Sequence, residues 1–135
     1  MGCGSWTSDS FKSYSKSVGR SVAKSGVIDS VYSNQEMFKA RIIDPAFNPK
    51  NVIRECCDSA EHPNTLPVIL ALDVTGSMGD AAVEVAKKLN IIMTKLYEKI
   101  SDVEFMVMGI GDLAYDDCPI QASQFESDIR IAEQL

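Results

Sequence analysis

Three oxygen-bearing side chains follow an apolar run of this chain at two-residue steps. Residues 67–78 read PVILALDVTGSM, so Asp73, Thr75 and Ser77 alternate with their neighbours, and Gly76 lets the chain bend between them. Alternate residues of an extended backbone point to the same side. One carboxylate and two hydroxyls are hard oxygen donors of the kind that Mg²⁺ and Ca²⁺ take in proteins. We therefore expect a divalent metal at this turn, because a carboxylate at the end of an apolar strand needs a charged or hydrogen-bonding partner.

The segments around this turn have the pattern of a strand, a helix and a second strand. Residues 68–72 form a short continuous apolar run, which is typical of a strand buried on both faces of a parallel sheet. Residues 79–100 have apolar side chains at helical spacing and lysines largely elsewhere, which predicts a long amphipathic helix. Residues 103–110 are a second apolar run that predicts another buried strand. The sequence therefore predicts an α/β fold with a parallel sheet, and the metal turn at the carboxyl end of its first strand.

A second helix is expected to start near the end of the chain. Ser123 and Glu126 have the spacing of a capping box, and Ile129, Ile131 and Leu135 supply apolar positions after it. Two parallel strands with one complete helix between them do not cover both faces of a sheet. We therefore expect a domain that is truncated after its second strand and the start of this second helix.

The first half of the chain carries weaker signals. Residues 1–33 are rich in serine and hold four basic and two acidic side chains, which predicts a loosely ordered basic arm. The apolar side chains from Phe11 onward at helical steps are the countersignal. Residues 34–65 are expected to be a linker with a short helix that starts at Asn48. Residues 66–135 then hold the α/β domain.

Charge and composition narrow the classes of function. The formal net charge is −6, and residues 66–135 carry twelve acidic and five basic side chains. An acidic surface repels a phosphate backbone, so we expect no nucleic-acid partner. No run approaches the ~20 apolar residues of a membrane span, and residues 1–30 lack the apolar core of a secretory signal. The four cysteines do not have the spacing of a disulfide framework or a zinc site, so we expect free thiols and a cytoplasmic location.

The DVTGS turn resembles the metal-ion-dependent adhesion site of the von Willebrand factor A domain. The family's pattern is DxSxS, and Thr75 stands here in place of the first serine. The order of apolar strand, metal turn, long helix and second strand is similar as well. The resemblance covers residues 67–135, about half of the chain, and implies the N-terminal part of a Rossmann-like three-layer fold. The amino-acid sequence of residues 109–128 is similar to that of intracellular, bacterial or phage-type members of this family.

This resemblance implies a protein-binding module that depends on a divalent metal and is not an enzyme. Asp73, Thr75 and Ser77 would bind Mg²⁺ or Mn²⁺, and an acidic side chain of a protein ligand would complete the coordination sphere. The family's further threonine and later aspartate have no match before Leu135. The partner's identity and the oligomeric state stay open.

Asp112 is a further candidate metal ligand. It follows the second predicted strand, which should neighbour the first, so its carboxylate can come within reach of the metal turn. The alternative is a solvated loop carboxylate beside Asp116 and Asp117. A calcium loop of the EF-hand type is excluded by the spacing of these aspartates and by the missing glutamate.

Two enzymatic functions remain as alternatives. Gly76, Gly79 and Ala82 form a GxxGxxA pattern, similar to nucleotide-binding oxidoreductases of the extended short-chain dehydrogenase type. The DVTGS turn is also similar to the DxTGT signature of enzymes that transfer a phosphoryl group through an aspartyl phosphate. Asp73 disfavours the first because a carboxylate repels a pyrophosphate. The downstream lysine and paired aspartates of the second are not recognisable.

Overall fold

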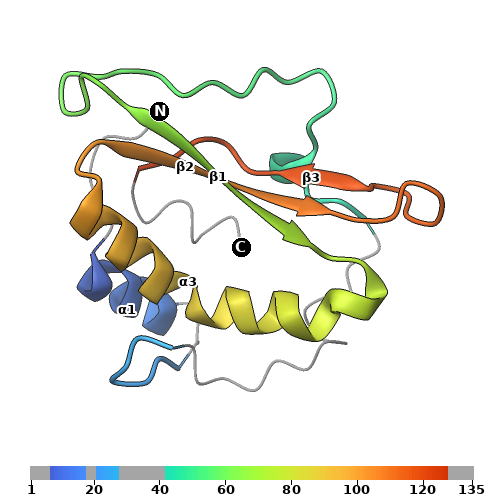
Figure 1. Cartoon of the computed structure of the whole chain (residues 1–135), viewed down its shortest axis with the longest axis horizontal. Helices are drawn as coiled ribbons and strands as arrows, with labels where there is room; N and C mark the ends of the chain where they lie inside the picture. The colour runs from blue at the N-terminus through green and yellow to red at the C-terminus, as the bar shows by residue number, and fades with distance from the viewer. Residues whose placement is uncertain (1–6, 18–20, 28–41, 128–135) are drawn as a thin grey trace.

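Two α-helices lie against one face of a three-stranded sheet in the computed structural model, which describes residues 7–17, 21–27 and 42–127 (Figure 1). The described elements are, in chain order, α1 (Ser8–Ser17), the 3-10 helix η1 (Pro45–Phe47), β1 (Leu66–Asp73), the 3-10 helix η2 (Gly76–Met78), α3 (Gly79–Lys99), β2 (Val103–Ile110) and β3 (Ile120–Ala122). The fold is mixed α/β, as the sequence predicts. None of these described helices combines the length and hydrophobicity that a membrane crossing needs.

β1 and β2 pair in parallel along their whole length. The register runs from Leu66 opposite Val103 to Asp73 opposite Ile110. The two strands and the 21-residue helix between them lie close to where the apolar patterns predict them. This pairing confirms the predicted strand, helix, strand unit and puts the carboxyl ends of both strands at one edge of the sheet.

The main core lies between β2 and the two helices. Phe105 of β2 packs with Leu89 and Met93 of α3 and with Phe11 of α1. Phe105 and Met93 are fully buried, and Phe11 is 2 % exposed. Tyr97 of α3 meets Phe105 edge to face, with ring centroids 5.5 Å apart. These contacts fix α3 over the sheet, and with it the turn that joins β1 to α3.

The N-terminal segment differs from the predicted loosely ordered arm, because α1 is part of the core. Thr7 and Ser10 cap this helix reciprocally: each backbone N–H donates to the other's hydroxyl, at 3.2 and 3.1 Å. Phe11 is the first member of the helical apolar pattern in the sequence, and it enters the main core. The cap and the buried aromatic ring offset the low helix propensity of a serine-rich segment.

The second face of β2 is covered by the chain that precedes β1. Cys56 packs against Met106 and Phe125 on this face. The backbone N–H of the following residue donates to Oε2 of Glu104 at 3.4 Å, and Glu104 is fully buried. β2 is therefore the strand that is buried on both faces.

The short helix predicted from Asn48 is not formed. The 3-10 helix η1 comes earlier, at Pro45–Phe47, where Asp44 caps it through a side-chain bond of 2.8 Å. The Asn48 side chain accepts from the backbone N–H two residues further on, at 3.0 Å, and so closes a turn. Asn51 then has a φ of 59°, and residues 52–58 have no helix or strand. The polar residues at this position form a turn and do not start a helix, because the residues that follow pack against β2.

An extended segment replaces the start of the predicted second helix. β3 pairs antiparallel with β2, and Glu126 and Phe105 exchange two backbone hydrogen bonds of 2.8 and 2.9 Å. The Ser123 hydroxyl does not cap a helix; it accepts from the backbone N–H of Val107 at 2.9 Å. The capping-box prediction is therefore wrong, because backbone groups of β2 pair with this segment. Residues 128–135, the rest of the predicted helix, lie outside the described residues.

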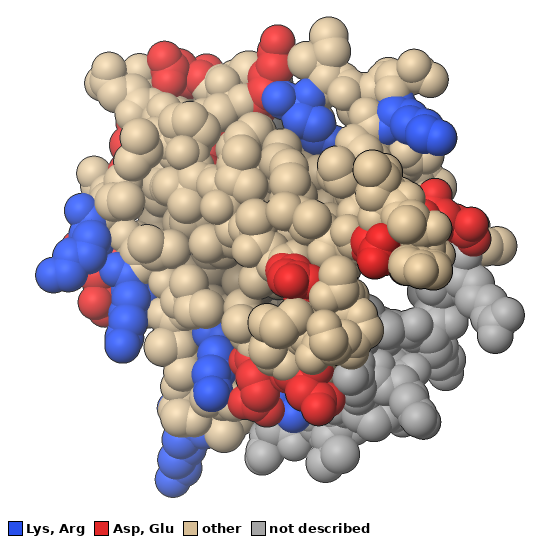
Figure 2. All heavy atoms as spheres, turned by 45° about the vertical axis from the view of Figure 1, so that its right-hand side comes forward, with Lys and Arg blue, Asp and Glu red and all other residues tan. Residues whose placement is uncertain are grey.

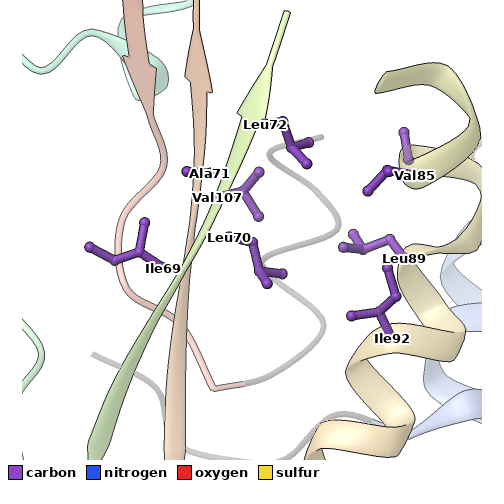
Figure 3. A pocket seen from close by; sticks show the side chains of 9 residues that line it. Ile69, Leu70, Ala71, Leu72, Val85, Leu89, Ile92 and Val107 are labelled. Atoms are coloured by element: carbon purple, nitrogen blue, oxygen red, sulfur yellow. The ribbon is translucent and has the colours of Figure 1, made fainter. Parts of the chain in front are cut away.

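β1 has one strand neighbour and one covered face within the described chain. The strand order is β1-β2-β3, so β1 is an edge strand of this sheet. Leu70 and Leu72 pack towards the main core, whereas Ile69 is 52 % exposed. The prediction of burial on both faces is wrong here, because the segment before β1 packs on β2. A cavity of about 240 Å³ between β1 and α3 is lined by apolar side chains, Leu70 and Leu72 among them (Figure 3).

Candidate metal site

The candidate metal turn lies at the carboxyl ends of the two parallel strands. Asp73 is the last residue of β1 and is paired with Ile110, the last residue of β2. The N–H of Val74 continues the ladder by donating to the carbonyl of Ile110 at 2.9 Å. η2 and α3 follow at once. Ligands of parallel α/β sheets gather at this edge, so the fold puts Asp73 where a ligand can bind.

Asp73 and Thr75 are in direct contact. The Thr75 hydroxyl donates to Oδ1 of Asp73 at 2.6 Å, and the Thr75 backbone N–H donates to the same oxygen at 2.9 Å. The hydroxyl bond first and the backbone bond second lower the pKa of Asp73, against a smaller opposing effect of desolvation. In the described structure Oδ2 of Asp73 accepts no hydrogen bond, and the Thr75 oxygen keeps its lone pairs after donating. Two of the predicted ligands therefore lie together, with oxygens left to bind a cation.

Ser77 belongs to the same turn but touches neither of the other two candidates through a hydrogen bond. It is exposed in η2, and its hydroxyl makes no hydrogen bond with the described residues. The N–H of Met78 donates to the carbonyl of Thr75 at 2.9 Å and closes the turn around Gly76. A Cβ on Gly76 would meet no atom within 4 Å. The outer side of the turn is thus open.

Asp112 is held by its own loop. Its Oδ1 accepts from the N–H of Ala114 at 2.7 Å, and its backbone N–H donates to Oδ2 of Asp116 at 2.6 Å. The N–H of Asp116 donates back to the carbonyl of Asp112 at 2.9 Å. No hydrogen bond among the described residues links Asp112 to the metal turn. One carboxylate oxygen of Asp112 is therefore engaged by its own loop, and its role as a metal ligand stays a prediction.

The N-terminus of α3 lies directly after the turn and affects its electrostatics. The residues at the cap positions of η2 and α3, Thr75 and Met78, make no side-chain cap bond. A helix N-terminus carries partial positive charge, which opposes a bound cation. Asp73 at the turn and Asp80 in the first turn of α3 supply the compensating negative charge. Cation binding at this turn therefore depends on the Asp73 carboxylate.

The donors of the metal turn fit a hard cation. Within the residues that the structure describes, no group of three or more His, Cys, Asp or Glu side chains is placed to hold a metal ion. The metal turn instead offers one carboxylate and two hydroxyls, which are oxygen donors suited to Mg²⁺ or Mn²⁺. A metal held by so few ligands keeps coordination positions for water and for a carboxylate from a partner.

A buried histidine–aspartate pair at the opposite end of the strands was not predicted from the sequence. His62 is 7 % exposed, and its Nδ1 lies 2.9 Å from Oδ1 of Asp102. Oδ2 of Asp102 accepts from the backbone N–H of Asn64 at 2.8 Å. The pair ties the segment before β1 to the loop before β2. The sequence gives no signal for it, because the two residues are 40 positions apart and His62 lies in a polar stretch.

Cys56 lies beside the buried Glu104 carboxylate. Burial first, and then the hydrogen bond to Glu104 and its charge, raise the pKa of the Cys56 thiol to about 12. The thiol is therefore protonated at neutral pH and packs as a small apolar group. Cys56, Cys57 and Cys118 are free thiols in the described structure.

Comparisons with known proteins found no similar protein or family. A scan against protein-family models, a search of curated proteins and a search of solved structures each gave no match. The function is therefore argued from the residues of this chain.

Proposed function

We propose that this chain carries a divalent-metal-dependent protein-binding module of the von Willebrand factor A type, with a Rossmann-like three-layer architecture. Asp73, Thr75 and Ser77 bind Mg²⁺ or Mn²⁺ in this proposal, and a carboxylate of a protein partner occupies a remaining coordination position. The module binds and does not catalyse. We assign it to the cytoplasm, in keeping with the spacing of its cysteines.

The contact between Asp73 and Thr75 is the observation that supports this proposal most. The Thr75 hydroxyl and N–H hold the Asp73 carboxylate in its ionised form at the carboxyl end of β1. The other carboxylate oxygen and the Ser77 hydroxyl make no hydrogen bond with described residues, so both have the capacity to coordinate. An ionised carboxylate on the open side of the turn suits a small divalent cation, and its charge offsets the partial positive charge of the helix N-terminus.

Each residue of the turn has a distinct role in this function. Asp73 supplies the negative charge, Thr75 orients the carboxylate and lowers its pKa, and Ser77 adds a neutral oxygen. The β1–β2 pairing fixes the base of the turn through the bond from Val74 to Ile110. The metal, when bound, supplies a positive charge that attracts a partner's carboxylate.

Thermal unfolding in metal-free buffer tests the proposal. Titration with Mg²⁺ or Mn²⁺ should raise Tm by several degrees at saturating metal, because a ligand that binds only the folded state stabilises it. Asp73→Ala should abolish the rise. Glu98→Ala, which removes an exposed carboxylate from the far end of α3, should retain it.

A second readout separates binding from stability. Free Mn²⁺ has an electron paramagnetic resonance signal that is lost on binding, so the wild-type protein and Glu98→Ala should deplete it and Asp73→Ala should not. Equal depletion, or an equal shift in Tm, by the Asp73→Ala variant would show that the metal binds elsewhere and would refute the assignment.

A further inference from the structure

Large apolar side chains gather where β2 turns into β3. Ile110 and Ile120 are cross-strand partners at the base of this connection, 43 % and 49 % exposed. Leu113 and Tyr115 lie in the loop between them and are 86 % and 88 % exposed. Four of the ten exposed large hydrophobic side chains among the described residues are thus in one connection. We name these four side chains the hairpin end; grouped apolar exposure marks interaction sites, whereas single exposed side chains need no explanation.

The loop that carries the hairpin end is ordered by its own hydrogen bonds. Asp116 accepts from the N–H of Asp112 through its carboxylate, at 2.6 Å, and donates its own N–H to the carbonyl of Asp112 at 2.9 Å. The N–H of Gly111 donates to the carbonyl of Pro119 at 2.7 Å and closes the loop. A Cβ on Gly111 would collide with the Asp116 carboxylate, so a larger residue here would displace that carboxylate from its place in the loop. An ordered loop presents its side chains at low entropic cost to a partner.

The loop of the hairpin end carries acidic side chains and no basic ones. Asp112, Asp116 and Asp117 lie in the loop, and the sequence has no Lys or Arg between Lys99 and Arg130. Figure 2 turns this side of the molecule forward: the middle of the visible face is uncharged apart from a few acidic side chains, and Lys and Arg lie towards its rim. Anionic lipid surfaces repel such a patch, and a second copy would bring like charges together. A surface with basic side chains complements it.

We propose that the hairpin end is a docking surface for a different protein, whose apolar pocket is bordered by Lys or Arg side chains. Leu113 and Tyr115 enter that pocket, and the loop aspartates face its basic border. Tyrosine is among the residues that contribute most at such contacts, because it buries a large area at little entropic cost. The docking needs no metal, because its contacts are the burial of apolar side chains and the attraction between the loop aspartates and basic side chains.

Selection from a displayed library of random short peptides tests this surface with the full chain as bait. Peptides that bind should combine aromatic or aliphatic residues with Lys or Arg. The double variant Leu113→Ser with Tyr115→Ser should weaken their binding about tenfold or more. Leu66→Ser is the control, since Leu66 is 48 % exposed at the opposite end of the β1–β2 pair and its loss should leave affinity unchanged. Excess EDTA should also leave affinity unchanged, so a failure of the proposed metal site does not affect this result.

Gly111→Ala tests the ordered loop separately. It keeps both apolar side chains but displaces the Asp116 carboxylate, so the selected peptides should bind it more weakly than they bind the wild-type chain. The proposal is overturned if no peptide is enriched, if enriched peptides bind the double variant as well as the wild type, or if the chain binds vesicles of anionic phospholipid through Leu113 and Tyr115.

Discussion

At the residue scale, Thr75 lowers the pKa of Asp73. Its hydroxyl and its N–H both donate to one oxygen of the carboxylate, and both bonds favour the ionised form. The folded-state pKa of Asp73 is therefore lowered from its ordinary value of 3.8. The resulting contribution to folding stability is present above the unfolded-state pKa and is lost as the pH falls through the folded-state value.

Thr75→Val should raise the pKa of Asp73 back towards its ordinary value, because it removes the hydroxyl and keeps the backbone donor. Thr75→Ser keeps a hydroxyl and should keep the pKa low. Carbon-13 NMR of the Asp73 carboxyl during an acid titration in metal-free buffer measures this directly. An Asp73 pKa that is the same in Thr75→Val and in the wild type would contradict the assigned role of the hydroxyl.

Cys56 should react slowly with iodoacetamide at neutral pH, because its thiol pKa is raised to about 12 and the thiolate is the nucleophile. Any stability that this shift contributes is full below the ordinary pKa of 9.0 and is lost as the pH rises through about 12. Glu104→Gln removes the neighbouring charge and should accelerate alkylation of Cys56. Peptide-resolved mass spectrometry measures the rate for Cys56 alone, and no acceleration would exclude Glu104 as a cause of the shift.

At the scale of elements, α1 is held to the core by two aromatic side chains, the buried Phe11 and the partly buried Tyr14. Phe11 is 2 % exposed and packs with Phe105 and Met93, so Phe11→Ala should reduce the free energy of unfolding by about 3–5 kcal/mol. Lys16→Ala, at an exposed position of the same helix, should have little effect. Urea unfolding measures both variants. A Phe11→Ala protein as stable as Lys16→Ala would mean that α1 does not share the core in solution.

The elements that sequence patterns predict well are those whose own residues decide their structure. β1 and β2 carry continuous apolar runs and α3 carries apolar side chains at helical spacing, and the structure places all three close to the predicted bounds. Ser123 and Glu126 have an equally clear capping pattern, yet backbone groups of β2, about 20 residues earlier, pair with that segment instead. The serine-rich composition likewise led to a wrong prediction for α1, because the packing of Phe11 and Tyr14 on the core outweighed it.

The candidate site divides in the same way. Asp73 and Thr75 are two residues apart on one strand end, so their contact follows from local geometry. Asp112 lies near in topology, but its carboxylate is engaged by its own loop, which the strand pattern does not encode. His62 and Asp102 meet only because the parallel register brings distant loops together. Contacts set by tertiary structure are those that a single sequence hides.

At the scale of the whole molecule, both proposed binding features lie at one end of the sheet. The metal turn follows β1, the hairpin end follows β2, and the bond from Val74 to Ile110 joins their bases. At the opposite end of the sheet, the His62–Asp102 pair joins the segment before β1 to the loop before β2. The two proposed binding features thus lie at the carboxyl ends of the strands, and the contact that ties the preceding chain to the sheet lies at their other ends.

The exposed edge of β1 has a practical consequence for handling the protein. Residues 66–73 contain no Lys or Arg, and Ile69 is 52 % exposed on a strand with one described neighbour. Natural proteins commonly protect such edges with charged side chains, bulges or a covering segment. Among the described residues this edge is open, so chains in a concentrated stock can associate by strand addition at residues 68–73, beyond Pro67, which has no N–H to donate.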